Sequence, residues 1–297
     1  MKIGLLDVDG HNFPNLALMK ISAYHKAQGD QVEMFFPMSH YDKVYMAKVF
    51  DFTPDFETCI NANEVIRGGT GYDLKNKLPA EIEHMYPDYS LYNIKNTAYG
   101  FLTRGCPRGC GFCIVGKKEG LKSYKVADLS GFWNGQKEIK LLDPNLLASK
   151  DNMNLLQQLA DSGAWIDFTQ GLDIRLMTEE ATEKIMRLKI KMIHFAWDYM
   201  KNSEIIIKNL RQFKAATNID MRKARVYVLT NFDTTGEEDL YRIYKLKELG
   251  YDPYVMVFNK QHAPRKIRQM QRWVNNKYIF RSGQAETFED YLRGVTK

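Results

Sequence analysis

Three cysteines that stand within eight residues of one another are the residues of this chain best suited to chemistry. Cys106, Cys110 and Cys113 follow the spacing C-x3-C-x2-C. Thiolates are soft ligands, and such a density suits zinc or an iron–sulfur cluster. A [4Fe-4S] cluster ordinarily takes four cysteines, so three cysteines from one loop would leave one iron with an open coordination site. An iron with an open site can bind a substrate or cofactor as well as pass electrons.

A zinc site is the main alternative for these cysteines. A structural zinc ion would require a fourth ligand at short range. The nearest candidates, Cys59 and His84, lie well upstream, and no histidine or cysteine follows the loop until His194. This distribution favours the cluster over a zinc knuckle. Cys59 stands apart from the other three, and we expect it to be a small buried hydrophobic side chain.

The motif resembles the signature of the radical S-adenosylmethionine (SAM) superfamily, because an aromatic residue directly precedes its last cysteine. The match comprises Cys106, Cys110, Phe112 and Cys113. The resemblance implies a [4Fe-4S] cluster whose open iron chelates the amino and carboxylate groups of SAM. It implies that reduction of the cluster cleaves SAM to methionine and a 5′-deoxyadenosyl radical, which abstracts hydrogen from a substrate. It also implies that Phe112 lies near the adenine and that a reductant such as flavodoxin or ferredoxin supplies the electron.

The same resemblance implies further SAM contacts at the ends of the strands that follow the cysteine loop. By position, these contacts fall to Asp143, Asn145, Gln170, Arg175, Asp198 and Asn231. The second strand end departs from the usual G-G-E of the family. Each residue also has a structural explanation: Asp143 precedes a proline, as turn residues do, and Asp198 is placed to cap a helix. Asp173 and Arg175 are close enough in sequence to pair at the surface.

The elements that must position these residues form an alternating α/β series. Six strand-then-helix units are predicted between residues 98 and 260, and the first strand, at 98–103, leads directly into the cysteine loop. Such a series builds a barrel, or part of one, in which the carboxyl ends of the strands face a shared site. A complete eight-unit barrel needs about 250 residues. The six units resemble the partial (β/α)6 TIM-like barrel of radical SAM enzymes.

Residues 1–86 are predicted to form a small Rossmann-like domain with an open sheet, followed by a linker at 87–97. This domain resembles the cobalamin-binding-like domain that precedes some radical SAM cores. Domains of that kind ligate cobalt through a D-x-H-x-x-G pattern. Asp9 and His11 match the pattern, but Pro14 occupies the glycine position. Cobalamin is therefore a further candidate cofactor, and the alternative is that Asp9 and His11 are loop-forming polar residues.

Residues 261–297 are predicted to form a helical tail rich in basic and aromatic side chains. The basic residues are Arg265, Lys266, Arg268, Arg272 and Lys277, and the aromatic ones are Trp273, Tyr278 and Phe280. Such a mixture can bind single-stranded nucleic acid through charge and stacking. Ile267, Met270 and Val274 recur at helical spacing, however. We favour the alternative that they form an amphipathic helix that closes the open edge of the barrel.

The composition is ordinary for a globular protein of 297 residues, with 44% hydrophobic and 26% charged residues. No apolar run approaches the roughly 20 residues of a membrane helix. The first residues turn acidic too quickly for a signal peptide, and the clustered cysteines argue against a disulfide framework. We therefore expect a cytoplasmic protein without a membrane partner. The formal net charge of +6 permits a nucleic-acid partner without requiring one.

Three functions follow from these observations. The first is a radical SAM enzyme whose substrate the sequence does not identify. The second is a cobalamin-dependent radical SAM methyltransferase, suggested by the small domain ahead of the barrel. The third is a nucleic-acid-binding or electron-transfer protein in which the cluster is structural.

Overall fold

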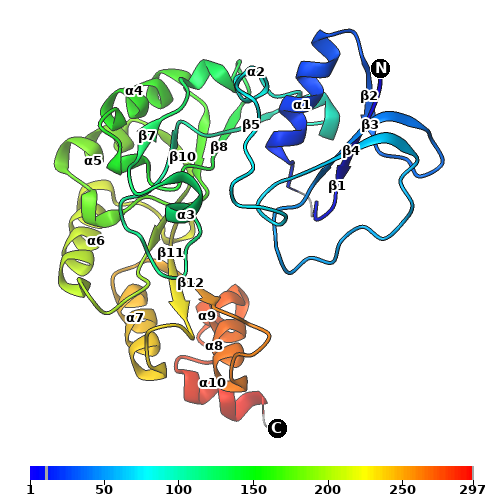
Figure 1. Ribbon diagram of the computed structural model, residues 1–297. Coiled ribbons are helices and arrows are strands. Elements are labelled where there is room, and N and C mark those ends of the chain that lie inside the picture. Colours follow the sequence, from blue (N-terminus) through cyan, green and yellow to red (C-terminus); the bar gives the residue numbers. More distant parts are fainter. Residues whose placement is uncertain (11–12, 296–297) are drawn as a thin grey trace. The chain divides into compact units, whose positions relative to one another are not determined.

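The computed structural model describes residues 1–10 and 13–295 as an α/β protein built around parallel sheets (Figure 1). The chain divides into two compact units. The first comprises Met1–Gly100 and Ala127–Ile139, and the second comprises Phe101–Val126 and Lys140–Lys297. His11, the candidate cobalt ligand, lies outside the described residues. The predicted α/β class is confirmed by the parallel pairing of strands in both units.

The first unit contains a four-stranded parallel sheet in the order β2-β1-β3-β4. Its strands are β1 (Lys2–Asp7), β2 (Gln31–Met34), β3 (Tyr41–Ala47) and β4 (Ala62–Gly68). Helix α1 (Leu16–Ala27) connects β1 to β2, and the Asn15 side chain caps its first turn by accepting a hydrogen bond from the Leu18 amide. The unit also contains α2 (Ala80–Glu83) and the short 3-10 helix η1 (Tyr89–Tyr92). Among the described residues of this sheet, a helix connects β1 to β2, whereas loops connect β2 to β3 and β3 to β4.

The two faces of this sheet are covered differently. Helix α1 covers one face, where Ile3, Leu5 and Leu18 are completely buried. On the other face, Tyr41 and Val44 are buried against side chains that come from loops. Both faces are thereby removed from water, as a parallel sheet requires.

The loops at the carboxyl ends of these strands are fixed by a carboxylate and a glycine. The Asp9 carboxylate accepts hydrogen bonds from the amides of Val49 and Phe50, at 2.9 and 2.8 Å. Gly69 has a φ of +95°, and a Cβ atom there would lie 2.3 Å from the carbonyl oxygen of Lys48. Only glycine tolerates this turn. In the structure Asp9 thus has the loop-forming role.

Cys59 is exposed, so the prediction that it is buried was wrong. Its neighbours Phe56 and Ile60 supply the contacts of this loop with the core around Tyr41. With those two side chains turned inward, Cys59 is left facing solvent.

The second sheet has six strands in the order β12-β11-β10-β9-β8-β5. They are β5 (Thr97–Gly100), β8 (Glu138–Leu141), β9 (Trp165–Phe168), β10 (Lys189–Ala196), β11 (Ala224–Thr230) and β12 (Asp252–Val257). The boundary between the compact units passes through β8. The pairs from β9 to β12 are parallel, and neighbours in the sheet follow one another along the chain. This sequential order occurs in barrels, and among the described residues no pairing between β12 and β5 closes the sheet.

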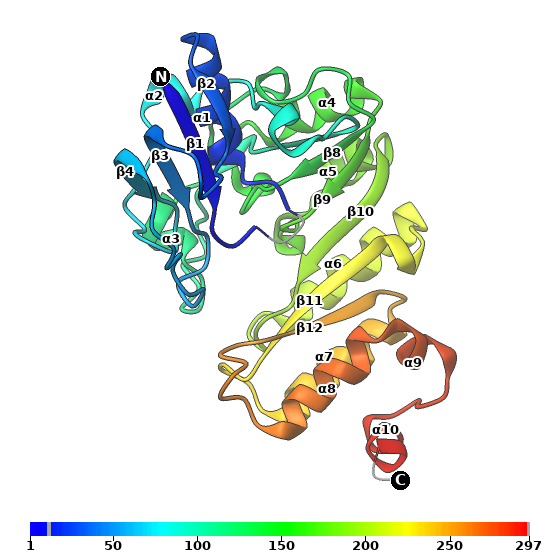
Figure 2. The same ribbon diagram turned by 90° about the vertical axis from the view of Figure 1, so that its right-hand side faces the viewer.

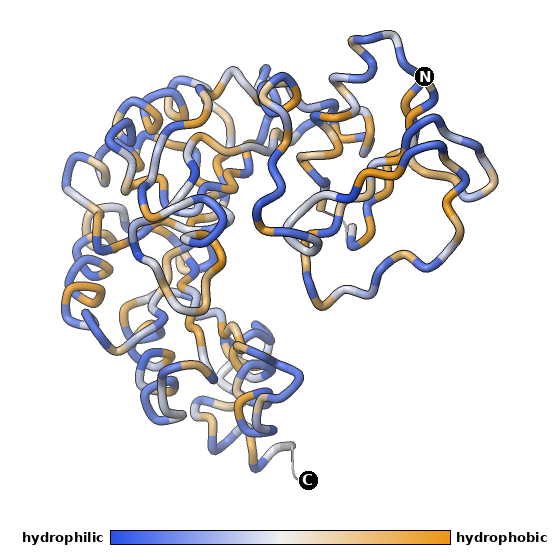
Figure 3. The backbone as a smooth tube through the Cα atoms, in the orientation of Figure 1, coloured by the Kyte–Doolittle hydropathy of each residue, from blue (hydrophilic) through white to orange (hydrophobic). Residues whose placement is uncertain are grey.

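Four helices connect the later strands of this sheet. They are α4 (Asn152–Ser162), α5 (Glu179–Met186), α6 (Ser203–Thr217) and α7 (Gly236–Glu248). They lie along the outer side of the strands (Figure 1), and hydrophobic and hydrophilic residues alternate along them (Figure 3). Helix α6 begins at Ser203. Asn202 precedes it with a left-handed φ of 67°, and within the described part of the chain its side chain makes no capping hydrogen bond.

The predicted strand at 98–103 is interrupted. β5 ends at Gly100, and the short strand β6 (Thr103–Arg104) instead pairs with β7 (Tyr124–Lys125) in an antiparallel ribbon. The amides of Leu102 and Thr103 donate to the buried carboxylate of Asp143, at 3.1 and 2.5 Å. These amides are therefore not available to continue a strand. The cysteine loop and helix α3 (Val115–Glu119) lie between β6 and β7.

The end of the chain forms α8 (Arg265–Asn275), α9 (Lys277–Ser282) and α10 (Phe288–Val295). Helix α8 lies along β12 (Figure 2) and buries Met270, Trp273 and Val274. The side chains of Gln271 and Asn275 hydrogen-bond to the backbone of β12 at Val255. Helix α8 thus packs its apolar side against β12, the strand at one end of the sheet. Within the described residues, no helix combines the length and the apolar character needed to span a membrane.

Candidate functional site

The cysteine loop is closed on itself by its backbone. The amide of Cys106 donates to the carbonyl of Gly120 at 3.2 Å, and the amide of Cys113 donates to that of Cys110 at 3.0 Å. Gly105 enters the loop with a φ of +78°, and a Cβ atom there would lie 2.2 Å from the carbonyl oxygen of Lys122. Any larger residue would force the two sides of the loop apart. The loop geometry therefore depends on this glycine.

Glu119, at the end of α3, holds the entrance of the loop. Its carboxylate accepts hydrogen bonds from the Arg104 guanidinium at 2.7 Å and from the Gly105 amide at 3.0 Å. Both donors directly precede the first cysteine. A charge-assisted pair of this kind is stronger than a neutral hydrogen bond, so the position of Cys106 is fixed from its N-terminal side.

Asp143 fixes the segment ahead of that entrance. Its carboxylate accepts from the amides of Leu102 and Thr103, and the Thr103 hydroxyl donates to it at 2.6 Å. Burial raises the pKa of Asp143 to about 6, although these hydrogen bonds work in the opposite direction. Its carboxylate faces the backbone and positions the strand that leads into the cysteine loop. The contact of Asp143 with SAM stays a prediction.

The three thiols are free and partly buried. Burial raises the pKa of Cys110, and the nearby carboxyl group of Asp198 adds to the shift. No group of three histidine, cysteine or acidic side chains within the described residues is arranged to hold a single metal ion. A cubane cluster differs from a single ion in this respect, because each thiolate binds a separate iron at its own corner.

A chain of polar contacts connects the cysteine loop to the ends of β8 and β9. Asp173 accepts from Arg108 of the loop at 2.5 Å and from Arg175 at 2.7 Å. Burial works to raise the pKa of Asp173, but the two arginines outweigh it and hold this pKa below its usual value. Asn145 lies beside them, with its amide nitrogen 3.5 Å from the sulfur of Cys106 and 3.4 Å from Asp173. Its side-chain oxygen is buried, and no described residue donates a hydrogen bond to it.

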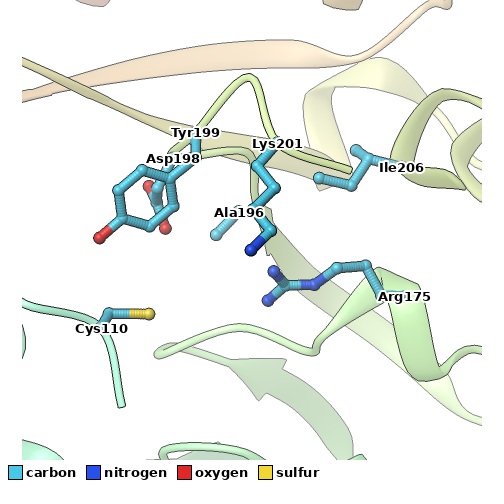
Figure 4. A pocket seen from close by; sticks show the side chains of 7 residues that line it. All are labelled: Cys110, Arg175, Ala196, Asp198, Tyr199, Lys201 and Ile206. Carbon is cyan, nitrogen blue, oxygen red and sulfur yellow. The ribbon is translucent and has the colours of Figure 1, made fainter. Parts of the chain in front are cut away.

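A small cavity of about 20 Å³ lies next to Cys110. Its lining consists of Cys110, Arg175, Ala196, Asp198, Tyr199, Lys201 and Ile206 (Figure 4). The Arg175 guanidinium and the Lys201 ammonium approach the same space, and the Cys110 sulfur faces it from the opposite side. Burial raises the pKa of the Asp198 carboxyl group to about 6. The cavity therefore combines two cations, one carboxyl group and one thiol.

The end of β10 is fixed by an ion pair that the sequence reasoning missed. Arg242 and Asp239 of α7 are completely buried and lie 2.5 Å apart. Arg242 also donates to the carbonyls of Trp197 and Leu229, at the ends of β10 and β11. A buried charge must be paired, so this arginine ties two strand ends to one helix. Both residues lie on the same face of α7 as the buried Ile243 and Leu246. This spacing in the sequence could have indicated a buried ion pair.

Aromatic rings form a cluster beside the cysteine loop. Phe112 lies 5.8 Å from Tyr199 and 5.7 Å from Phe232, measured between ring centroids. Phe232 in turn lies 4.8 Å from Phe258. The cluster places Phe112 next to a residue of the cavity lining, because Tyr199 belongs to both.

Two of the predicted contacts stand apart from the cavity. Gln170 is exposed in the turn after β9, and Asn231, with a φ of 62°, donates to the carbonyl of Phe258 at 2.9 Å. Neither residue lines the cavity. Arg175 and Asp198 do line it, and Asn145 reaches Cys106. Tyr199 and Lys201, which the sequence reasoning missed, lie one and three residues after Asp198 and could have been found by extending that strand end.

Comparison with known proteins identifies no family. No protein-family model matches the chain, and no curated protein matches it in sequence. Among solved structures, it is similar to the crystal structure of Streptococcus suis SuiB bound to S-adenosylmethionine, with a TM-score of 0.40 and 14% identity. That match covers 63% of this chain and 44% of the other. At this level the similarity carries no argument about function.

Proposed function

We propose that the chain is a radical SAM enzyme that binds a [4Fe-4S] cluster through Cys106, Cys110 and Cys113. The observation that carries the proposal is the cavity beside Cys110, where Arg175, Lys201 and Asp198 from successive strand ends meet one thiol of the three-cysteine loop. A zinc knuckle would have no use for such a cavity.

The residues present fit a cofactor that carries both an ammonium and a carboxylate group. Arg175 and Lys201 supply positive charge for a carboxylate. The unpartnered oxygen of Asn145, close to Cys106, is an acceptor of the kind that an amino group requires. A bound cluster with SAM at its open iron would supply one-electron cleavage of SAM to methionine and a 5′-deoxyadenosyl radical. The protein's own task is to bind, orient and shield these groups.

The remaining residues of the site divide between direct contact and support. Phe112 and Tyr199 offer ring faces beside the loop for a planar base. Asp198 offers a carboxyl group for hydroxyl or amino donors. Asp143, Glu119 and Arg242 support the loop and the strand ends without entering the cavity lining.

The direct test is anaerobic reconstitution with iron and sulfide, followed by reduction with dithionite in the presence of SAM. Release of 5′-deoxyadenosine is expected from the wild-type chain, together with the broad visible absorbance of an iron–sulfur cluster. Cys110→Ala should lose both signals. Cys59→Ala should keep both, because this exposed cysteine lies outside the loop. Cluster assembly without any 5′-deoxyadenosine would contradict the proposal, as would a loop that retains only zinc.

Cobalamin gains no support from the described residues. The Asp9 carboxylate is occupied by the amides of Val49 and Phe50, and the matching histidine lies outside the described residues. Titration of the wild-type chain with hydroxocobalamin, followed by absorbance, tests the methyltransferase alternative. We expect no spectral change.

A further inference from the structure

The segment between Asp252 and Glu286 has an unusual distribution of charge. Residues 253–285 include seven lysines and arginines but no aspartate or glutamate. Lys277 and Arg281 are accounted for, because they pair with the buried carboxylate of Asp252 at 2.8 and 3.0 Å. The other five, at positions 260, 265, 266, 268 and 272, make no ion pair within the described part of the chain.

Helix α8 presents three of these cations on one face. Arg265, Arg268 and Arg272 are exposed and, with Gln269, line a surface hollow of about 320 Å³. At 1.5 Å per residue, Arg265 and Arg272 lie about 10 Å apart along the helix axis. This span suits one or two adjacent phosphates of a nucleic-acid strand.

The arginine face is held by a rigid element. The opposite side of α8 buries Trp273 and Val274 completely, and Gln271 and Asn275 hydrogen-bond to β12. The arginines are therefore carried on a helix that is fixed to the sheet. The same burial argues against a membrane surface as the partner, because the apolar residues of α8 are not free to enter lipid.

Two exposed aromatic rings are linked to the cysteine loop by ring contacts and to α8 along the chain. Phe258 and Phe232 are 39% and 40% exposed, and their centroids are 4.8 Å apart. Phe232 contacts Phe112 of the cysteine loop. On the other side, only residues 258–264 separate the end of β12 from the start of α8. Ring faces and a row of cations are together the features that bind single strands, by stacking bases and neutralising phosphates.

We propose that the arginine face of α8, together with Phe232 and Phe258, binds single-stranded nucleic acid and that a nucleotide of this strand is the substrate. The part about the substrate rests on the proposed radical SAM function, whereas the binding itself does not. A duplex is a poorer partner, because its bases are stacked on one another and offer no faces to Phe232 and Phe258.

The test measures binding of a fluorescein-labelled single-stranded RNA of about 20 nucleotides to the full chain, by anisotropy at several salt concentrations. Arg268→Glu/Arg272→Glu should weaken binding at least tenfold near 100 mM salt. The slope of log K against log salt should fall by about 1.4, since each phosphate contact with a single strand contributes roughly 0.7. Phe258→Ala should weaken binding about fivefold or more through lost stacking.

The matched control is Arg187→Glu/Arg211→Glu, which makes the same change in net charge at exposed arginines of the same unit. It should change affinity less than threefold. Equal losses in the two double variants would overturn the proposal, because binding would then follow net charge alone. Weak wild-type binding, with a Kd above about 100 μM, would overturn it as well. Equal affinity for a duplex of the same length would overturn the stacking role of the two phenylalanines.

The wild-type chain also separates this proposal from the proposed function. If it binds RNA through α8 but releases no 5′-deoxyadenosine from SAM, the proposed nucleic-acid-binding surface is supported and the radical SAM function is contradicted. If it cleaves SAM but does not bind RNA, the enzyme proposal stands and the nucleic-acid substrate fails.

Discussion

The two units fix the loops at their strand ends with the same two devices, yet only one of them assembles a candidate site. In each unit an aspartate accepts hydrogen bonds from two consecutive backbone amides, Asp9 in the first and Asp143 in the second. In each unit a glycine with positive φ lies against a lysine carbonyl, Gly69 in the first and Gly105 in the second.

The difference lies in what these devices hold. In the first unit the Asp9 carboxylate accepts hydrogen bonds from two amides of the loop that it organises. In the second unit the loop carries three free thiols. The strand ends add polar side chains that can still bind a ligand, such as Asn145, Arg175 and Lys201. A strand end can form a binding site when other residues hold its loop in place. Its own polar side chains are then free to bind a ligand.

The largest contrast is expected from the paired glycines. Gly105→Ala and Gly69→Ala both place a Cβ atom against a carbonyl oxygen, at 2.2 and 2.3 Å, and both retain a strained φ. Each should lower the free energy of unfolding by about 4 kcal/mol. Only Gly105→Ala should abolish iron binding after reconstitution. Urea unfolding and iron analysis measure the two effects, and equal iron loss in both variants would break the comparison.

The buried ion pair of α7 has the next largest expected effect. Arg242→Met leaves Asp239 as an unpaired buried charge and removes the donors to Trp197 and Leu229, so it should cost about 3 to 4 kcal/mol. Arg242→Met/Asp239→Leu should recover part of that loss, because no charge is then left without its partner. Urea unfolding of the three proteins measures this. A double variant as unstable as the single one would contradict the account.

The paired aspartates sharpen the comparison further. Asp143→Ala and Asp9→Ala each leave two backbone amides without their acceptor and should each cost about 2 to 3 kcal/mol. Asp143→Ala should also reduce the iron retained per chain several-fold, since its carboxylate holds the segment that enters the cysteine loop. Asp9→Ala should leave the iron content at the wild-type value. Iron loss in the Asp9 variant would indicate that the first unit contributes to the cluster site.

The smallest effect concerns pH. Burial lowers the pKa of His194 to about 4, and its Nδ1 lies 3.0 Å from the carbonyl of Phe168. The unfolded chain binds this proton below a pH of about 6.5 while the folded chain does not, so stability is lost as the pH falls from 6.5 toward 4. Between pH 6.5 and 5 the loss should be about 2 kcal/mol.

His194→Gln keeps a donor for Phe168 but does not titrate, so its stability should fall by less over the same range. The difference between the two proteins is the measured quantity, because Asp143 and Asp198, whose pKa values are raised to about 6, act in the opposite direction in both. Asp167 and Arg225, which lie near the histidine, also remain in both proteins. Parallel pH curves would show that His194 does not carry the effect.

Local features were predictable because they depend on neighbours in the chain. The side chains of Asn15 and Thr178 cap α1 and α5 by accepting hydrogen bonds from amides only three residues further along the chain. Strands and helices alternate from β8 to β12, as the sequence predicted. The errors occur where distant groups intervene. The strand predicted at 98–103 is split because the amides of Leu102 and Thr103 bond to Asp143, some forty residues away.

The sequence by itself determined the three-cysteine loop, the alternation of strands and helices that follows it, and the clustering of cations in the tail. These features need only residue types and short spacings. The tertiary structure decided which polar side chains bond within the protein and which remain available to a ligand. It directed the Asp143 carboxylate to backbone amides and paired Arg242 with Asp239. It also brought Lys201 and Tyr199 next to Cys110. Such outcomes depend on burial, because a polar group removed from water must take whichever partner the fold places beside it.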